Sequence, residues 1–564
     1  MPAYNDQQKR EITFLNGLNN NGAVATDSYA TRYNDTPTKW ENGVIRYVFS
    51  DTSQFTPIEK DAMVQSMAIW SGVANVTFVQ VSSIEKPTLT ILAPQREKGP
   101  VNNWDIADSK GAFGTSVRVD HDPAVIGSSA LPYVKEGVMY MKIKGLNSNG
   151  LSDGAGDTDP LGNANYGTGG NDGPYAVTHE LGHVLELGHG GPYNNTATGS
   201  NQYGPYDMSQ WTIMSYMYPS TANLKYKDSL PTVTKEAYWN SYRATTPMEL
   251  DVAAAQQVYG NPITKTFAGN NVFGYNSNIK YTTLSNEKAN IGAYDFSINK
   301  LPVISIWDSG KNNTLDLSED ASGVSINLNP GAFSSTAGLK NNIGIDQDTR
   351  IDKAIGGSGD DTFTLNVSGD IIDGKGGDNT VIINSAKAGY SLSKSDNGTV
   401  TVTNGDKTDI LLNIKTIKFV DFSVDTLTIS VVAAASSDMA SVVRLFEAAV
   451  DRQPEGAGLN YWVQKVQAGA SLTDIAVNMV ECQEFNNLYG DVKLLSPTVY
   501  ISELYANVLH REGSHSDINY WVSYMAAGAT PDQVLINFAT CPENINNTLY
   551  VQNLHQASTG TWMF

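Results

Sequence analysis

The 564-residue chain has little cysteine, little histidine and no long apolar run. Its two cysteines, Cys482 and Cys541, exclude a disulfide framework and a multi-cysteine zinc site. Since no stretch of about 18 apolar residues occurs, we expect no membrane-spanning helix. The 37 Lys and Arg against 58 Asp and Glu give a net charge of −21, which disfavours nucleic acid and anionic membranes but is compatible with calcium. The first residues contain no apolar segment, so we expect no cleavable N-terminal export signal.

The few histidines are clustered. Three of the seven, His179, His183 and His189, lie within the segment HELGHVLELGH. A helix beginning near Asp172 places His179 and His183 one turn apart on the same face, where they can bind one zinc ion. Glu180 is then placed to take a proton from the zinc-bound water. His189 reaches the same metal only if the helix ends soon after His183, and three imidazoles plus water would make a catalytic zinc site.

The segment resembles the serralysin group of metzincin metalloproteases. The resemblance rests on the HExxH pattern, the third histidine six residues later, and the run from Thr212 to Tyr216 (TIMSY). It implies that the three histidines bind zinc and that Glu180 is the general base. It also implies that Met214 lies beneath the metal and that Tyr216 is a movable zinc ligand. Metzincin substrates add as a strand to a sheet edge, which we assign to the 111–117 region.

One position departs from the metzincin pattern. Glu186 stands where the family has the glycine at which the helix stops. If that position requires positive φ, Glu costs about 1 kcal/mol or more of strain relative to Gly. Two outcomes are open: Gly188 takes over the turn, or the zinc site is distorted. The Glu186 carboxylate would also lie close enough to the metal to bind it or to perturb the water.

The remaining residues before 260 fit an α+β protease domain. We expect strands at 45–49, 88–93 and 138–143. A capping box at Thr56 to Glu59 should open a helix that buries Met63, Met67 and Trp70. A similar arrangement at Thr246 to Glu249 should open a helix that stops at Gly260. Residues 1–38 show little periodicity and correspond either to a short propeptide or to a flexible tail.

A calcium-repeat pattern follows in the Gly- and Asp-rich part of the chain. Residues 356–364 match the nine-residue GGxGxDxUx repeat, and the phase continues at Gly374, since 374 − 356 = 18. The apolar positions Ala354, Phe363, Ile372 and Val381 should fill the core of a β-roll in which turns eighteen residues apart stack. Hard cations such as Ca²⁺ prefer the oxygen atoms that such turns offer, and we expect one to three ions. The candidate calcium residues here are Asp352, Gly357, Gly359, Asp361, Asp370, Gly374, Gly376 and Asn379.

This region also resembles the serralysin roll. In the family a calcium site joins a WDxGGND segment to a GDxVxGFNS segment. By residue match, the ligands here would be Asp308, Gly310, Asn313 and Asn270, while Asp352 would contribute to another site. Lys311 replaces a family glycine, and Asn270 and Asn313 replace aspartates, so these sites should bind calcium more weakly.

Residues 435–564 have a helical pattern and contain an internal repeat. Asn460-Tyr461-Trp462 recurs as Asn519-Tyr520-Trp521, and Cys482 recurs as Cys541, in each case 59 residues on. This tandem resembles a small helical domain appended to secreted bacterial calcium-repeat proteins. The Tyr-Trp pair indicates core packing more than a sugar-binding platform. The two cysteines are either buried thiols or one disulfide bridge.

The sequence therefore predicts a multidomain protein in four parts. They are an N-terminal segment (1–38), an α+β metzincin protease domain (39–260), a calcium-binding parallel β-roll or sandwich with closing β structure (261–430), and an all-α domain (435–564). The resemblance implies a secreted, extracellular zinc endopeptidase, stabilised by calcium, that hydrolyses peptide bonds of extended protein substrates. It further implies a monomer, a proteinaceous inhibitor and a one-step secretion apparatus. The alternative is a non-catalytic calcium-binding surface or matrix module with a decayed zinc site.

Overall fold

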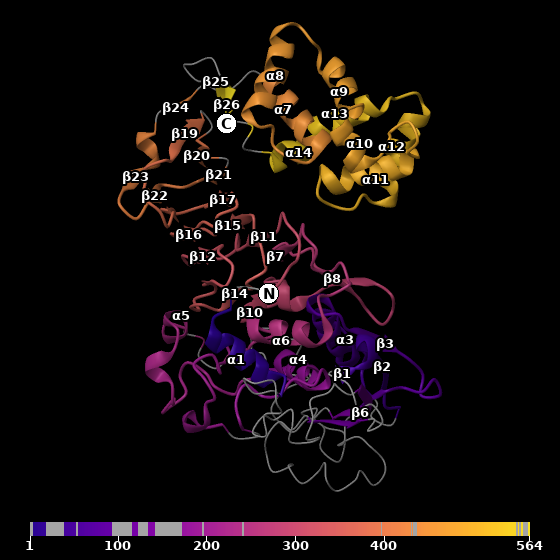
Figure 1. The fold of residues 1–564 in the computed structure, drawn as a ribbon, viewed down its shortest axis with the longest axis vertical. Helices are drawn as coiled ribbons and strands as arrows, with labels where there is room; N and C mark the ends of the chain where they lie inside the picture. Colours follow the sequence, from indigo (N-terminus) through magenta and orange to yellow (C-terminus); the bar gives the residue numbers. More distant parts are fainter. Residues whose placement is uncertain are drawn as a thin grey trace. The chain divides into compact units, whose positions relative to one another are not determined.

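Figure 1 shows the chain as a computed structural model drawn as a ribbon. The structure describes residues 4–17, 39–51, 55–92, 116–121, 133–140, 172–193, 197–237, 239, 242–395, 398–405, 407–429, 431–432, 437–548, 551, 554–556 and 562–563. The chain divides into two compact units, Met1–Asn366 and Val367–Phe564. This division falls inside the predicted 261–430 domain, and the four-part division remains a prediction.

The first unit contains a mainly parallel sheet. Its described strands are β1 (Lys39–Trp40), β2 (Val44–Phe49), β3 (Thr77–Gln80), β4 (Leu89–Leu92), β5 (Ser116–His121) and β6 (Tyr133–Tyr140). The order is β1-β6-β4-β2-β3, and β5 pairs antiparallel with β6. The strands predicted at 45–49 and 88–93 are confirmed. The strand predicted at 138–143 begins earlier, at Tyr133, and its described part reaches Tyr140. Residues 141–143 and 111–115 lie outside the described part.

Helix α3 (Pro57–Val73) begins at the predicted capping box. Thr56 N donates to Glu59 Oε2 (2.7 Å), and Glu59 N donates to Thr56 Oγ1 (3.3 Å). Met63, Met67 and Trp70 are buried as predicted. Trp70 Nε1 donates to the carbonyl of Thr178 (3.0 Å) in helix α4 (Asp172–Val184), so α3 packs against the helix that carries the first two clustered histidines.

Helix α6 (Glu249–Tyr259) begins later than predicted. Its N-cap is Met248, whose backbone N donates to Asp251 Oδ2 (2.8 Å). Thr246 does not cap it, because its hydroxyl accepts a hydrogen bond from Ser305 N (2.9 Å). The predicted stop at Gly260 is confirmed, and Gly260 has φ of 86°. Between α4 and α6 lies the short helix α5 (Thr232–Lys235).

The N-terminal residues form helix α1 (Asp6–Leu15), although their sequence shows little periodicity. Ile12, Phe14 and Leu15 are buried. The carbonyl of Leu15 accepts a hydrogen bond from Gly188 N (2.7 Å), and Asn16 Nδ2 donates to the carbonyl of Ala254 (3.2 Å) in α6. Helix α1 is therefore built into the core beside the segment that follows the two histidines of α4.

Short strands follow in the first unit, and many of them are stacked in parallel. They are β7 (Val272–Gly274), β8 (Lys280–Thr282), β9 (Lys288–Asn290), β10 (Ile304–Ile306), β11 (Thr314–Asp316), β12 (Ser325–Asn327), β13 (Phe333–Ser334), β14 (Ile343–Ile345), β15 (Lys353–Ile355) and β16 (Thr362–Thr364). The central residues of β7, β11 and β15 are Phe273, Leu315 and Ala354, which are in register and fully buried. Ile326 and Phe363 pair in the same way between β12 and β16.

The second unit continues with strands of the same kind. They are β17 (Ile371–Asp373), β18 (Thr380–Ile382), β19 (Ser391–Ser395), β20 (Val400–Asn404), β21 (Lys407–Leu412), β22 (Thr416–Lys418), β23 (Ser423–Asp425) and β24 (Val431–Val432). Strand β17 is parallel to β21, and β18 is parallel to β22. The predicted apolar positions Ala354, Phe363, Ile372 and Val381 are all fully buried, which confirms the phase. The predicted stacking of residues eighteen apart would join the two units and remains a prediction.

A helical region completes the second unit. Its helices are α7 (Ser437–Val450), α8 (Gly456–Gln467), α9 (Leu472–Val480), α10 (Gln483–Tyr489), α11 (Pro497–Asn507), α12 (His515–Ala526), α13 (Pro531–Thr540) and α14 (Pro542–Asn547), followed by β25 (His555–Gln556) and β26 (Trp562–Met563). The internal repeat is visible in its contacts. Arg452 pairs with Glu484, and 59 residues later Arg511 pairs with Glu543, each through two hydrogen bonds.

The repeated aromatic pair divides between core and surface. Trp462 and Trp521 pack against the helical core, whereas Tyr461 and Tyr520 are 51% and 65% exposed, so the prediction of core packing is wrong for the tyrosines. Cys482 and Cys541 are free thiols, and they are partly exposed rather than buried. Each caps a short helix by accepting a backbone N–H, from Phe485 and Asn544 respectively.

No helix in the described part of the chain is both long and apolar enough to cross a membrane.

The buried carboxyl of Glu11 in α1 gives a test of how this helix is held. Its Oε1 accepts hydrogen bonds from Gln7 Nε2 (3.0 Å) and Tyr206 N (3.1 Å). Burial raises the pKa of Glu11 from 4.5 to about 8. The folded chain therefore favours the protonated carboxyl. The contribution of this protonated group to the free energy of unfolding is complete below about pH 4.5 and is lost as the pH rises through about 8.

We expect Glu11→Gln, which stays neutral, to remove this pH dependence. At about pH 9 the variant should be more stable than the native chain by a few kcal/mol, and at about pH 4 the difference should nearly vanish. Urea unfolding at both pH values measures this. Glu287→Gln, at an exposed position, is the control. A Glu11→Gln effect of equal size at both pH values would contradict the expectation.

Candidate metal centre

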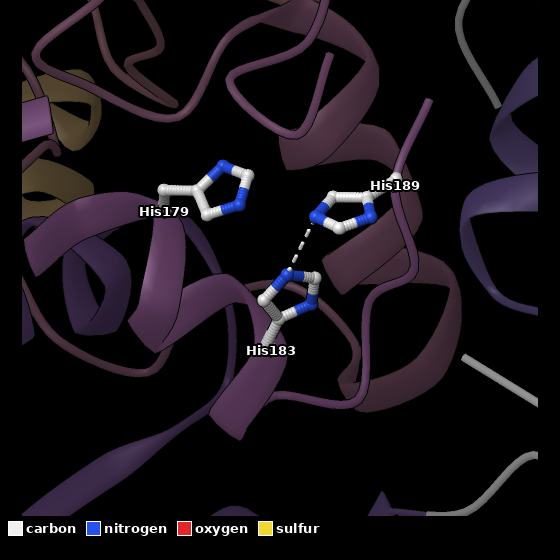
Figure 2. A group of neighbouring side chains, drawn as sticks. All are labelled: His179, His183 and His189. Carbon is white, nitrogen blue, oxygen red and sulfur yellow. Dashed lines mark hydrogen bonds between the residues drawn. The ribbon is translucent and has the colours of Figure 1, made fainter. Parts of the chain in front are cut away.

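The three clustered histidines meet in the folded chain. Figure 2 shows His179 and His183 on α4 and His189 on the segment that follows it, with the three rings facing a common point. One ring nitrogen of each lies within 4.8 Å of the others, and all three side chains are buried. Within the described residues, this is the only group of three or more His, Cys, Asp or Glu side chains with such geometry.

Each ring is oriented by a backbone carbonyl. His179 Nδ1 lies 2.8 Å from the carbonyl of Ile213, His183 Nδ1 lies 2.7 Å from that of Leu187, and His189 Nδ1 lies 2.8 Å from that of Tyr193. A carbonyl only accepts, so in each contact Nδ1 must carry the proton and donate. In the neutral rings the Nε2 atoms then carry lone pairs.

Those lone pairs face one another. His183 Nε2 and His189 Nε2 are 3.1 Å apart, and His179 Nε2 is buried with no hydrogen-bond partner among the described residues. Two nitrogens bound to one tetrahedral zinc at about 2.0–2.1 Å would themselves be about 3.3 Å apart. The donor set is therefore suited to a zinc ion in chemistry and spacing.

Burial also keeps the rings neutral. It lowers the pKa of His179 to about 4, and the positive charge of Arg243 acts in the same direction. Burial lowers the pKa of His183 well below its ordinary value, and the neighbouring His179 adds to the effect. Neutral imidazole is the form that binds a metal.

The end of α4 brings His189 back to the other two histidines. Glu186 N donates to the carbonyl of His183 (2.9 Å), and Leu187 N donates to that of Gly182 (3.0 Å), which together form a Schellman motif. Glu186 itself takes the left-handed conformation, with φ of 69°, and Gly188 does not. Neither expected outcome holds: Gly188 does not take over the turn, and the three rings still converge. The Glu186 carboxylate lies near Tyr259 and is not part of the histidine group.

Met214 packs directly beneath α4. It is fully buried, and a Cβ added to Gly182 would lie 2.5 Å from its sulfur. The glycine between the two helical histidines therefore lets the Met214 segment approach the helix. Tyr216 lies beside the metal centre, with its ring 4.5 Å from the ring of His189 and 5.6 Å from that of His179. Glu180, next to His179 on α4, is buried.

Two buried aspartates support this arrangement, and the sequence did not reveal them. Asp251 at the start of α6 accepts hydrogen bonds from Thr212 Oγ1 (2.5 Å) and Ile213 N (2.6 Å), and Ile213 in turn orients His179. Asp207 accepts from Tyr193 Oη (2.5 Å) and Ser215 Oγ (2.7 Å). Burial raises the pKa of Asp207 to about 6 and that of Asp251 to about 7. The only sequence signal for Asp251 is its place three residues after the helix N-cap.

Three of the predicted calcium residues near β7 and β11, Asp308, Gly310 and Asn313, are close together, and Asn271, which the sequence did not indicate, contacts two of them. Asp308 Oδ1 accepts from Gly310 N, and Asp308 Oδ2 accepts from Asn271 Nδ2, both at 2.7 Å. Asn313 Oδ1 accepts from Asn271 N (3.0 Å). Of the two neighbouring asparagines, Asn271 and not Asn270 donates its side chain to Asp308.

The predicted calcium residues in the turns of the repeat differ in what their side chains contact. In the first unit, Asp361 accepts from Gly357 N and Val324 N, both at 2.8 Å, while Asp352 pairs with Arg350. Gly359 passes close to the backbone of Ser322 and Gly323. In the second unit, Asp370 and Asn379 are buried, with Asp370 N bonded to Asp409 Oδ1 (2.9 Å). Asn379 Nδ2 donates to the carbonyls of Gly374 and Gly376.

The chain combines a histidine group suited to a metal ion with a β-rich domain and a later helical region, and the comparisons with known proteins match the last two. A family model described as "Peptidase M10 serralysin C terminal" matches residues 263–477. A second model, for a domain of unknown function, matches residues 483–548, within the predicted tandem.

Several curated relatives are serralysins by name. The chain is 29% identical to Serralysin B of Dickeya chrysanthemi over 362 residues, which is 62% of this chain and 61% of that protein. It is 31% identical to Serralysin of Proteus mirabilis over 356 residues (61% and 59%). It is 29% identical to Metallopeptidase AprA of Pseudomonas marginalis over 331 residues (58% of each). The chain thus matches about three-fifths of the length of these relatives.

The resemblance read from the motif is confirmed: the chain is similar to serralysins over about three-fifths of its length, and residues 263–477 match the serralysin C-terminal model.

The left-handed Glu186 gives a test of the turn. Replacing it by Gly should raise the free energy of unfolding by about 1 kcal/mol, because a residue with a Cβ is strained at positive φ and glycine is not. Zinc content, measured by atomic absorption, should not change.

Glu186→Gln is the matched control, because it removes the charge and keeps the strain. Its stability should equal that of the native chain. A gain with Gln as large as with Gly would mean that charge, and not backbone conformation, sets the effect.

Proposed function

We propose that the chain is a secreted zinc-dependent endopeptidase of the metzincin kind, which hydrolyses peptide bonds in extended protein substrates. The observation that carries this is the convergence of three Nε2 lone pairs from His179, His183 and His189, each fixed by a carbonyl on the other ring nitrogen. When bound there, zinc would polarise the scissile carbonyl and lower the pKa of the attacking water.

Glu180 is the group we assign to proton transfer. It directly follows His179 on α4, and its side chain is buried with the histidines. A carboxylate there accepts the proton that the attacking water releases. Glu180 then delivers that proton to the amine that leaves when the C–N bond breaks.

Tyr216 is assigned to the carbonyl oxygen of the substrate. Its ring rests against His189 and stacks on Tyr193 (5.3 Å between centroids). Tyr216 N donates to Tyr193 Oη (3.2 Å), and Tyr193 is anchored in turn by Asp207. The phenol is thus held on a supported backbone, and its hydroxyl can donate a hydrogen bond to the oxygen as negative charge develops.

The substrate is proposed to bind along β5. This strand pairs with β6 on one side and contacts α4. A peptide that adds to a sheet edge is held by main-chain hydrogen bonds, so many side chains are tolerated. The likeness to serralysins is the basis for proposing export through a one-step secretion apparatus, inhibition by a protein, and action as an extracellular monomer.

Calcium is proposed at the turn of residues 356–361. Asp361 is buried, and after burial itself the nearby Asp320 and Asp360 raise its pKa, so negative charge is concentrated there. A cation would relieve that repulsion. The residues present fit a calcium ion, which prefers carboxylate and carbonyl oxygens.

Replacing Glu180 by Gln should lower kcat/KM for casein by about 10²–10⁴-fold, because Gln cannot accept the proton. Zinc content and thermal stability should be unchanged, since Glu180 is not among the converging ligands. Zinc-loaded native and variant chains are compared in parallel.

Glu186→Gln, the same chemical change six residues later, should keep full activity. A zinc-loaded native chain without activity, or a Glu180→Gln chain as active as the native one, would overturn the proposed function and favour a non-catalytic surface module.

A further inference from the structure

The turn between β17 and β18 is closed by an amide. Asn379 is fully buried. Its Nδ2 donates to three backbone carbonyls, those of Gly374 (2.8 Å), Gly376 (2.8 Å) and Asn413 (2.9 Å). Three acceptors surround this atom, so it must be the nitrogen and not the oxygen of the side chain. A single N–H₂ group therefore sits where carbonyl oxygens from two turns converge.

The same position holds an oxygen in the preceding repeat. Asp361 stands eighteen residues before Asn379, since 379 − 361 = 18. A Cβ added to Gly356 would meet Asp361 Oδ2 at 2.1 Å, and one added to Gly374 would meet Asn379 Nδ2 at 2.5 Å. The two side chains thus pack on equivalent glycines with opposite polarity. An anionic acceptor occupies one turn and a neutral donor occupies the other.

The charges around Asn379 are already balanced. Asp373 accepts hydrogen bonds from Asn413 Nδ2 (2.8 Å) and pairs with Lys375 Nζ (2.9 Å). Asp378 pairs with Lys415. The ammonium groups of Lys375 and Lys415 therefore lie beside this turn, and their positive charge opposes the binding of a calcium ion there.

Another asparagine, Asn313 in the first unit, also donates its side-chain amide to backbone carbonyls. Asn313 Nδ2 donates to the carbonyl of Arg350 (3.0 Å) and, more weakly, to that of Gly310 (3.5 Å). Gly310 lies three residues before Asn313, as Gly376 lies three residues before Asn379. An asparagine amide that donates to the carbonyl of a glycine three residues earlier is thus found in two turns.

We propose that the side-chain amide of Asn379 takes the place of a calcium ion in this turn, so that residues 371–418 fold without calcium. A calcium ion would bind such carbonyls at about 2.3–2.6 Å and would need carboxylate charge beside them. Here the three carbonyls already share the two hydrogens of the amide, and Asp373 and Asp378 are paired with lysines. The calcium requirement of the serralysin-type roll is therefore absent from this part of the chain, whatever the activity of the zinc centre.

Hydrogen exchange of the full-length chain tests this, read in peptides that cover β17, β18, β21 and β22. In the native chain their exchange should be the same in excess EGTA and in millimolar CaCl₂. Asn379→Asp places an anionic oxygen against the three carbonyls. In this variant the amide exchange rate of the same peptides in EGTA should rise by about ten-fold or more. Adding CaCl₂ should reverse the rise, because the turn then offers calcium a carboxylate.

Asn379→Ala is the matched control, because it removes the amide without adding charge. Its exchange should rise as in Asn379→Asp, but CaCl₂ should not reverse the rise. Slower exchange of the native peptides on adding CaCl₂, by about ten-fold, would show that calcium binds there and would overturn the proposal. Native-like exchange in Asn379→Ala would overturn it as well, since the amide would then contribute nothing.

Discussion

The candidate metal centre depends on three hydrogen bonds between imidazole Nδ1 atoms and backbone carbonyls. The carbonyls belong to Ile213, Leu187 and Tyr193, which lie in separate segments of the first unit. Each bond fixes the proton on one nitrogen and so aims the lone pair of the other at the common point. The turn after α4, the Met214 segment and the loop at Tyr193 must all be in place before the rings converge. The packing of these three segments therefore supports the three carbonyls.

That support comes from carboxyl groups buried at an energetic cost. Asp251 ties the Met214 segment to α6, and Asp207 ties Tyr193 to Ser215. Burial raises the pKa of both groups, which means that their ionised forms are held in unfavourable surroundings. Several N–H and O–H donors around each offset the loss of water. Such networks fix one geometry firmly, because a displaced donor leaves a buried acceptor unsatisfied.

Much of the fold and of the candidate site was predicted from local sequence patterns. The spacing of His179 and His183 indicated a shared helix face, and the nine-residue phase predicted the burial of Ala354, Phe363, Ile372 and Val381. The features that were missed depend on contacts distant in sequence. Asn271 reaches Asp308, Asp251 reaches Thr212, and the amide of Asn379 reaches the carbonyl of Asn413. An Asn in place of an Asp looks in sequence like a weakened ligand. Only the three carbonyls around it show that it donates.

Helix α1 links the two ends of the first unit. Tyr4 Oη lies 3.4 Å from Asp346 Oδ1, 342 residues away, and Leu15 accepts the N–H of Gly188 beside the metal centre. The contact of Tyr4 with Asp346 can therefore form only after the chain has been made as far as Asp346, just beyond β14. Closing so long a loop is slow and comes late. A chain cut at the predicted boundary of residue 260 would therefore keep the contact of Leu15 with Gly188 but lose that of Tyr4 with Asp346.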